Sequence, residues 1–143
     1  MRKILTSIIF IMLAYGANAQ QWQYSMADAM KIAKENDQKI ILVFSGSDWC
    51  TPCIKLENDI WSTDEFMAYA KDNYVMLKAD FPRKKKNKLS EEQARNNNIL
   101  AEMYNPNGYF PLVVIMDSDA KVIGNLGYKK VSPKQYIELI NDL

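Results

Sequence analysis

The sequence predicts one α/β domain in which a central mixed sheet is flanked by helices. Short apolar runs rich in β-branched residues alternate with segments whose apolar residues recur at helical spacing, which is typical of parallel strands joined by helical crossovers. The last two apolar runs are separated only by a short polar turn, which indicates an antiparallel hairpin. The 143 residues fit one domain, since domains commonly have about 100–200 residues. We expect about four to five strands and about four helices.

The elements of the first half follow from periodicity and capping residues. Ser25 is a suitable N-cap for a helix over residues 26–36, whose apolar side chains recur at helical spacing. Residues 40–44 form a continuous apolar run rich in β-branched residues, as expected for a strand buried on both faces. From Pro52 the pattern becomes helical, with a break at Ser62. The segment QWQYS, in front of the first helix, is a candidate edge strand.

The second half continues the alternation. Residues 74–81 form another buried strand, and Ser90 with Gln93 predicts a capping box at the start of the helical segment SEEQARNNNILAEMY. The runs PLVVIMD and KVIGNLGY are the two strands of the hairpin. A second capping box, formed by Ser132 and Gln135, predicts the last helix.

The first nineteen residues differ from the rest of the chain. Two basic residues precede the apolar run ILTSIIFIMLAYG, and ANA follows it, which are the three parts of a secretory signal peptide. The alternative is a membrane anchor, but a spanning helix needs about 20 mainly apolar residues, and this run is shorter and contains Thr6, Ser7 and Gly16. We expect residues 1–19 to be a cleaved signal and residues 20–143 to be the mature domain, exported to the periplasm of a Gram-negative cell or secreted.

Charge and composition narrow the function classes. Loss of the signal lowers the count of basic residues from 18 to 16, against 17 acidic ones, so the mature domain has no global attraction for nucleic acid. Histidine is absent, which removes Ser-His-Asp and Cys-His catalysis, histidine-ligated zinc and the CxxCH haem signature. We expect no cofactor and no nucleic-acid partner.

The only two cysteines, Cys50 and Cys53, are separated by Thr51 and Pro52. A closed zinc site needs four nitrogen or sulfur ligands, which one chain cannot supply here, although a dimer could pool two pairs. A structural disulfide is the stronger alternative. However, so short a ring constrains the unfolded chain least, and an exported pair meets an oxidising environment. We therefore favour a redox couple over a metal site or a staple.

The position of the pair between a strand and a helix suits redox chemistry. Free backbone N–H groups and the positive end of the helix dipole would stabilise a thiolate on Cys50. Pro52 suits the first helical turn, where its missing N–H costs nothing. Helical geometry places Cys53 about one turn further and more buried. We predict that Cys50 attacks and that Cys53 resolves the mixed disulfide.

The segments KIILVFSGSDWCTPC and GYFP together resemble the thioredoxin superfamily. The run over residues 25–81 resembles its exported bacterial subgroup even more closely, and the likeness covers residues 22–143. The resemblance implies a thioredoxin-like fold with the CxxC motif at a helix N-terminus. It also implies that Phe110-Pro111 is a cis peptide lying beside the disulfide.

The resemblance also implies a substrate-binding surface, because in such proteins the backbone before the cis-proline pairs with the substrate chain. For Trp49, which we expect to shield the active-site face, a plain core role is the alternative. The expected substrate-binding residues are Trp49, Thr51, Pro52, Tyr109, Phe110 and Pro111.

One position departs from the family pattern. Ordinary thioredoxins carry a buried acid six positions before the first cysteine, where it helps to deprotonate the resolving one, and this chain has Phe44 there. Two carboxylates are candidates for proton transfer instead: Glu57, four residues after Cys53, and Asp80, at the end of the neighbouring strand. For Glu57 a solvated helix charge is the favoured alternative.

The basic run RKKKNK spans residues 83–88. The simpler interpretation is a solvated loop that replaces a tighter turn, and the functional alternative is a docking patch for an acidic partner.

The sequence thus predicts an exported monomeric thiol–disulfide oxidoreductase that exchanges disulfides with protein substrates through Cys50 and Cys53. A membrane or periplasmic thiol protein would supply or accept the electrons. The alternative is a non-catalytic thioredoxin-like binding module whose disulfide is structural and whose groove beside Pro111 holds a client.

Overall fold

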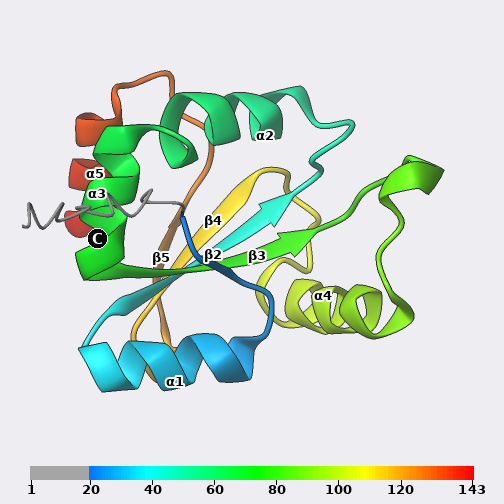
Figure 1. Ribbon diagram of the computed structural model, residues 1–143, viewed down its shortest axis with the longest axis horizontal. Coiled ribbons are helices and arrows are strands. Elements are labelled where there is room, and N and C mark those ends of the chain that lie inside the picture. The colour runs from blue at the N-terminus through cyan, green and yellow to red at the C-terminus, as the bar shows by residue number, and fades with distance from the viewer. Residues whose placement is uncertain (1–19) are drawn as a thin grey trace, which may run out of the picture.

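The computed structural model describes residues 20–143, which form a five-stranded mixed sheet between two layers of helices (Figure 1). The strand order is β1-β3-β2-β4-β5. β3 is parallel to β1 and β2, whereas β4 is antiparallel to β2 and to β5. The predicted α/β fold, its edge strand and its terminal hairpin are confirmed. The strands are β1 (Trp22–Gln23), β2 (Lys39–Ser45), β3 (Tyr74–Asp80), β4 (Leu112–Met116) and β5 (Val122–Leu126).

The predicted signal peptide, residues 1–19, lies outside the described residues. Within residues 20–143, no helix combines the length and the apolar character that crossing a membrane requires.

The helices follow the predicted segments, with one subdivision. The stretch that begins near Pro52 is an α-helix, continues as a π-helical segment and ends at Ser62, after which Thr63 caps a new helix. Residues 20–143 therefore contain five α-helices, where about four were expected. They are α1 (Met26–Asn36), α2 (Thr51–Leu56), α3 (Asp64–Asn73), α4 (Glu91–Tyr104) and α5 (Pro133–Asn141), with the π-helical segment η1 (Glu57–Trp61) and a 3₁₀ turn, η2 (Lys85–Asn87).

The capping predictions are confirmed at α1 and α5 and half wrong at α4. Ser132 and Gln135 form both hydrogen bonds of the capping box. At α4 the Ser90 hydroxyl accepts from the Gln93 backbone N–H, but the Gln93 side chain does not return to the cap. It donates to the carbonyl of Tyr24 and to the side chain of Asn97 instead. A tertiary contact to the first strand region thus replaces the local one.

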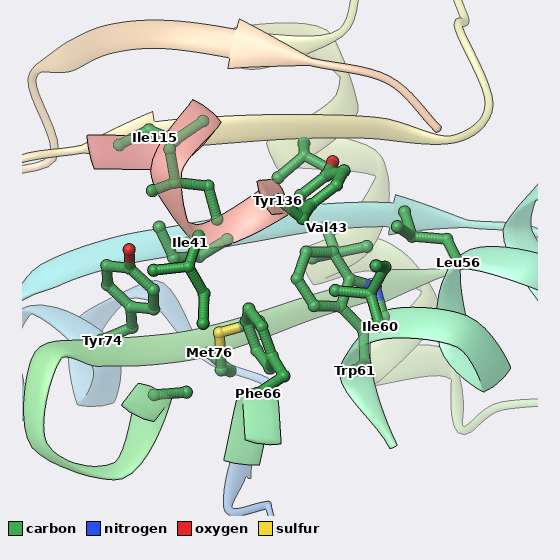
Figure 2. Packing of buried hydrophobic residues seen from close by; sticks show 14 residues of the cluster. Ile41, Val43, Leu56, Ile60, Trp61, Phe66, Tyr74, Met76, Ile115 and Tyr136 are labelled. Atoms are coloured by element: carbon green, nitrogen blue, oxygen red, sulfur yellow. The ribbon is translucent and has the colours of Figure 1, made fainter. Parts of the chain in front are cut away.

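The first face of the sheet is packed by α2, η1, α3 and α5 (Figures 1 and 2). Trp61 lies at the centre of an aromatic group, with its ring centroid 4.7 Å from that of Phe66 and 5.4 Å from that of Tyr136. Ile41 and Val43 point into this cluster from β2, and Met76 points into it from β3 (Figure 2). We call this cluster the aromatic face.

The second face is packed by α1 and α4, which lie together on the other side of the sheet (Figure 1). Its buried side chains are mainly aliphatic and small, and two alanines of α1 allow that helix to approach the sheet closely. Leu42 and Phe44 of β2 belong to this cluster because neighbouring strand residues point to opposite faces. We call it the aliphatic face.

Candidate active site

Cys50 and Cys53 form a disulfide at the start of α2. Cys50 is the N-cap of this helix, and its sulfur accepts a hydrogen bond from the Cys53 backbone N–H at 3.3 Å. The Gly46 backbone N–H donates to the Cys53 sulfur at 3.5 Å. Both sulfurs are buried to a similar extent, so the expected difference in burial between them is slight: the two residues are 5% and 3% exposed. Thr51 and Pro52 are exposed beside them.

The loop before the cysteines is fixed to the end of β3. Asp80 accepts hydrogen bonds from both the backbone N–H and the hydroxyl of Ser47. The Cys50 backbone N–H donates to the Gly46 carbonyl at 2.8 Å and closes the turn. A Cβ at position 46 would collide with the indole of Trp49, so glycine is required there. Asp80, predicted as a candidate for proton transfer, is therefore a structural ligand of this loop.

Trp49 joins three segments around the disulfide. Its Nε1 donates to the carbonyl of Phe81 at 2.7 Å, and its ring lies 5.4 Å from that of Phe110. The Arg83 guanidinium stacks over the indole, 3.7 Å from the ring centroid. Phe110 also packs against Phe81. The half-buried Trp49 thus connects the CxxC segment, the end of β3 and the loop before β4.

The Phe110-Pro111 peptide bond is cis, as the resemblance implied. The segment before it is held by the buried side chain of Asn105, which donates to the Tyr109 carbonyl at 2.8 Å and accepts from the Tyr109 N–H at 2.9 Å. The Tyr109 backbone is therefore already paired, while its side chain is 61% exposed. A hollow of about 480 Å³ adjoins this segment, and Gly127 and Lys129 line its other side.

The structure places the Phe44 side chain on the aliphatic face, whereas α2 covers the aromatic face. The preceding residue, Val43, belongs to the aromatic face, and its register partner on β3 is Lys78. The two residues differ because neighbouring strand residues point to opposite sides of a sheet.

Glu57 is a partly exposed residue that has an ion-pair partner, with 38% of its side chain exposed. Its carboxylate forms an ion pair with Lys78 at 3.1 Å and accepts from the Ser62 hydroxyl at 3.1 Å. The Lys78 ammonium also lies 4.0 Å from the centroid of the Trp22 ring. The Glu57 backbone N–H donates to the Cys53 carbonyl, so the pair lies one helical turn beyond Cys53. The sheet face that α2 covers therefore has a carboxylate close to it, and this carboxylate belongs to the helical segment after α2, not to β2.

Asp48 is a residue that the sequence analysis missed. Its carboxylate accepts from the backbone N–H groups of Arg83 and Lys84, at 2.9 and 3.0 Å, and from the Asn87 side chain at 2.9 Å. These hydrogen bonds, the Arg83 N–H first, lower the pKa of Asp48 to about 2. This contact could not be predicted from the sequence around the cysteines, because the residues that bind Asp48 lie about 35 positions further along the chain. The basic run is therefore anchored to the active-site loop.

The chain matches the family model described as thioredoxin-like over residues 21–118. It is 34% identical over 120 residues to the disulfide bond reductase DsbH of Chlamydia pneumoniae, a match that covers 84% of this chain and 70% of the relative. A solved structure of a DsbH oxidoreductase superposes with a TM-score of 0.80 at 30% identity, covering 99% of this chain and 93% of that one. A thioredoxin from Thermus thermophilus shares the fold, with a TM-score of 0.61 at 14% identity over 85% of each chain.

Proposed function

Because the chain belongs to the thioredoxin-like family, we propose that it exchanges disulfides with protein substrates outside the cytoplasm, using Cys50 and Cys53. It is a thiol–disulfide oxidoreductase of the thioredoxin type. One observation carries the proposal. The disulfide lies at the start of α2, next to the exposed residues Thr51 and Pro52, and the neighbouring Trp49 packs against Phe110 in the loop before Pro111. A purely structural disulfide would not need an exposed surface beside it.

The reaction begins from the dithiol form. The Cys50 thiolate attacks one sulfur of the substrate disulfide, which forms a mixed disulfide and releases the other substrate sulfur as a thiolate. The Cys53 thiolate then attacks the Cys50 sulfur, so that the Cys50–Cys53 bond forms and the second substrate thiol leaves. Two electrons pass to the substrate. A thiol protein of the membrane or periplasm restores the dithiol, and the same steps in reverse oxidise a substrate.

The two cysteines have different surroundings. In the dithiol form the Cys53 N–H and the helix N-terminus favour the thiolate on Cys50, because both stabilise negative charge at that position. Cys53 lies deeper in the helix and receives the Gly46 N–H. These contacts support the assignment of Cys50 as the attacking sulfur and Cys53 as the resolving one.

Glu57 is the better of the two proton-transfer candidates. Asp80 is committed to Ser47, whereas the Glu57–Lys78 pair lies one turn beyond Cys53 on the same face of the sheet. We assign Glu57 to the movement of the Cys53 proton through an intervening water.

The substrate chain binds along the segment that ends in Pro111. Since Asn105 already pairs the Tyr109 backbone, the main-chain contact falls to Phe110, and Tyr109 contributes its exposed ring. The hollow beside Pro111 receives the neighbouring substrate side chains. Thr51 and Pro52 form the opposite border of the contact, next to Cys50.

The decisive experiment measures the reduction potential of the Cys50–Cys53 pair and the turnover of insulin disulfides, with Cys50→Ser as the inactive control. We expect a potential above about −300 mV and turnover that Cys50→Ser abolishes. A pair below about −300 mV without turnover would behave as a structural disulfide. That result would favour the alternative, a non-catalytic binding module.

A further inference from the structure

The basic loop, residues 83–88, forms part of the active-site surface. It follows β3 and includes η2, and it projects from the edge of the sheet at which the CxxC segment leaves β2 (Figure 1). Asp48 holds its backbone, and Trp49 stacks against Arg83. Asp48 and Trp49 are the two residues directly before Cys50. A protein whose disulfide reaches Cys50 therefore approaches this loop.

The charges of the loop are available to a partner. The one carboxylate that anchors it, Asp48, accepts from backbone N–H groups and from an amide, not from the lysine ammonium groups. In residues 20–143 the ion pairs join Lys34 to Asp119 and Lys78 to Glu57, so none of the loop lysines is neutralised this way. The exposed cations are Arg83, Lys84, Lys85, Lys86 and Lys88.

This positive charge is local. The mature domain has nearly balanced charge, with 16 basic and 17 acidic residues once Arg2 and Lys3 are removed. The loop concentrates five of those cations within six positions. Charge concentrated at one rim of a reactive site accelerates the encounter with a partner of opposite charge.

A hollow of about 340 Å³ lies between the loop and α4. Its lining includes apolar residues (Phe81, Pro82, Leu89, Ala94), four cations (Arg83, Lys84, Lys85, Lys88) and two carboxylates (Asp80, Glu91). Asp80 is hydrogen-bonded to Ser47, and the cations outnumber the carboxylates. This combination fits an apolar side chain that has carboxylates on either side. A fully polar acidic tail would leave this hollow unfilled.

We propose that the basic loop and this hollow bind an acidic segment of the protein disulfide substrate, with an apolar residue of that segment seated in the hollow. The inference rests on the proposed function. It adds the class of substrate: disulfides close to a segment that alternates carboxylates with an apolar residue. The contact places the segment beside Cys50 because Asp48 and Trp49 hold the loop against the cysteine motif.

The test compares two peptides that contain the same disulfide, one flanked by glutamates around a leucine and one by glutamines around the same leucine. We expect wild-type protein to reduce the acidic peptide with a kcat/KM about tenfold higher at low salt. The preference should disappear at about 1 M salt, where the screening length falls to about 3 Å. Lys85→Glu with Lys86→Glu should remove or invert the preference.

The matched control is Lys31→Glu with Lys121→Glu, which makes the same change in net charge at exposed positions on α1 and beside the β4–β5 turn. This variant should keep the preference. Equal rates for the two peptides with wild-type protein, or equal losses in both double variants, would overturn the proposal. Reduction of the uncharged hydroxyethyl disulfide should be the same in all three proteins, and its absence in all of them would refute the proposed function instead.

Two further outcomes are decisive. Ala94→Phe fills the hollow, and we expect it to weaken the acidic peptide by several-fold while leaving hydroxyethyl disulfide unaffected; no change would refute the role of the hollow. If the loop variant instead loses binding to phosphatidylglycerol vesicles with unchanged peptide kinetics, the loop contacts an anionic membrane, and the substrate proposal is wrong.

Discussion

The two faces of the sheet are built from different side chains. The aromatic face combines rings in mainly edge-to-face contact with polar groups that have partners. Tyr74 donates to Asn141, Tyr136 donates to the Gly127 carbonyl, and Glu57 pairs with Lys78. The aliphatic face is filled by small and branched side chains, between α1, α4 and the sheet. The cysteine helix packs on the aromatic face. Both sides of the sheet bury polar groups, because Asn97 and Asn105 at α4 are buried and hydrogen-bonded. What distinguishes the aromatic face is the Glu57–Lys78 ion pair beside the cysteine helix.

This difference also shows why a strand position cannot be assigned by counting alone. Val43 and Phe44 are neighbours in β2 but belong to opposite faces. The face of each residue is set by the sheet and its helices, and not by the distance to the cysteines.

Phe44→Asp should be the most damaging change. It removes a large buried ring and leaves a carboxylate among aliphatic side chains, and the combined loss should exceed about 5 kcal/mol. Val43→Asp should cost at least about 2 kcal/mol less, because its register partner is Lys78. Urea denaturation measures the free energy of unfolding of both variants. The face assignment is wrong if the two aspartates have equal effects; Phe44→Leu, which preserves an apolar side chain, is the control.

Trp61→Ala should reduce the free energy of unfolding by about 3–5 kcal/mol, because the indole is surrounded by the rings of the aromatic face. On the aliphatic face, Leu100→Ala should cost only about 2 kcal/mol, at the lower end for such substitutions, since Leu100 is smaller and slightly exposed. Thermal and urea unfolding of both variants provide the comparison. Equal losses would contradict the view that the rings dominate the core.

Glu57→Gln should slow the resolving step by about 10²-fold, the lower end of the usual effect of general acid–base groups. When the reduced protein reacts with Ellman's reagent, the first coloured group reports attack by Cys50 and the second reports resolution by Cys53. We expect only the second phase to slow, and its pH profile to move. Glu102→Gln, an exposed change on α4, is the control. An unchanged second phase removes Glu57 from the mechanism.

Tyr136→Phe should change stability least and mainly at high pH. Burial raises the pKa of Tyr136 above its ordinary value of 10.0, so above about pH 10 the unfolded chain loses this proton while the folded protein retains it. Stability from this group is therefore complete below pH 10 and falls as the pH rises. The variant loses one hydrogen bond, about 1 kcal/mol at neutral pH, but should unfold less steeply with alkali. An identical alkaline slope would contradict the burial of this hydroxyl.

Local patterns predicted most of the fold. Capping residues such as Ser25 and Ser132, and the apolar runs of β2 and β3, depend on neighbours in sequence, and the structure confirms them. The π-helical segment η1 was not predicted, because the same apolar spacing suits an α-helix. The second half of the Ser90 box failed because Gln93 found a tertiary partner.

The residues of the candidate site also fall into two groups, those predicted from local motifs and those that depend on tertiary contacts. The cysteine pair and the proline before β4 are visible in sequence as motifs. Asp48 and Asn105 are not, because each acts through hydrogen bonds to backbone groups that only folding brings within reach. The orientation of Phe44 and the pairing of Glu57 with Lys78 likewise depend on which helix covers which face.

The most direct test of the central claim, that Cys50 attacks substrates and Cys53 resolves them, is to express Cys53→Ser in the native host and separate its disulfide-linked complexes on non-reducing gels. We expect mixed disulfides between Cys50 and client proteins that disappear on reduction and are absent from the Cys50→Ser, Cys53→Ser double variant. If Cys53→Ser traps nothing, or if Cys50→Ser traps the clients instead, the assignment of the two sulfurs is wrong.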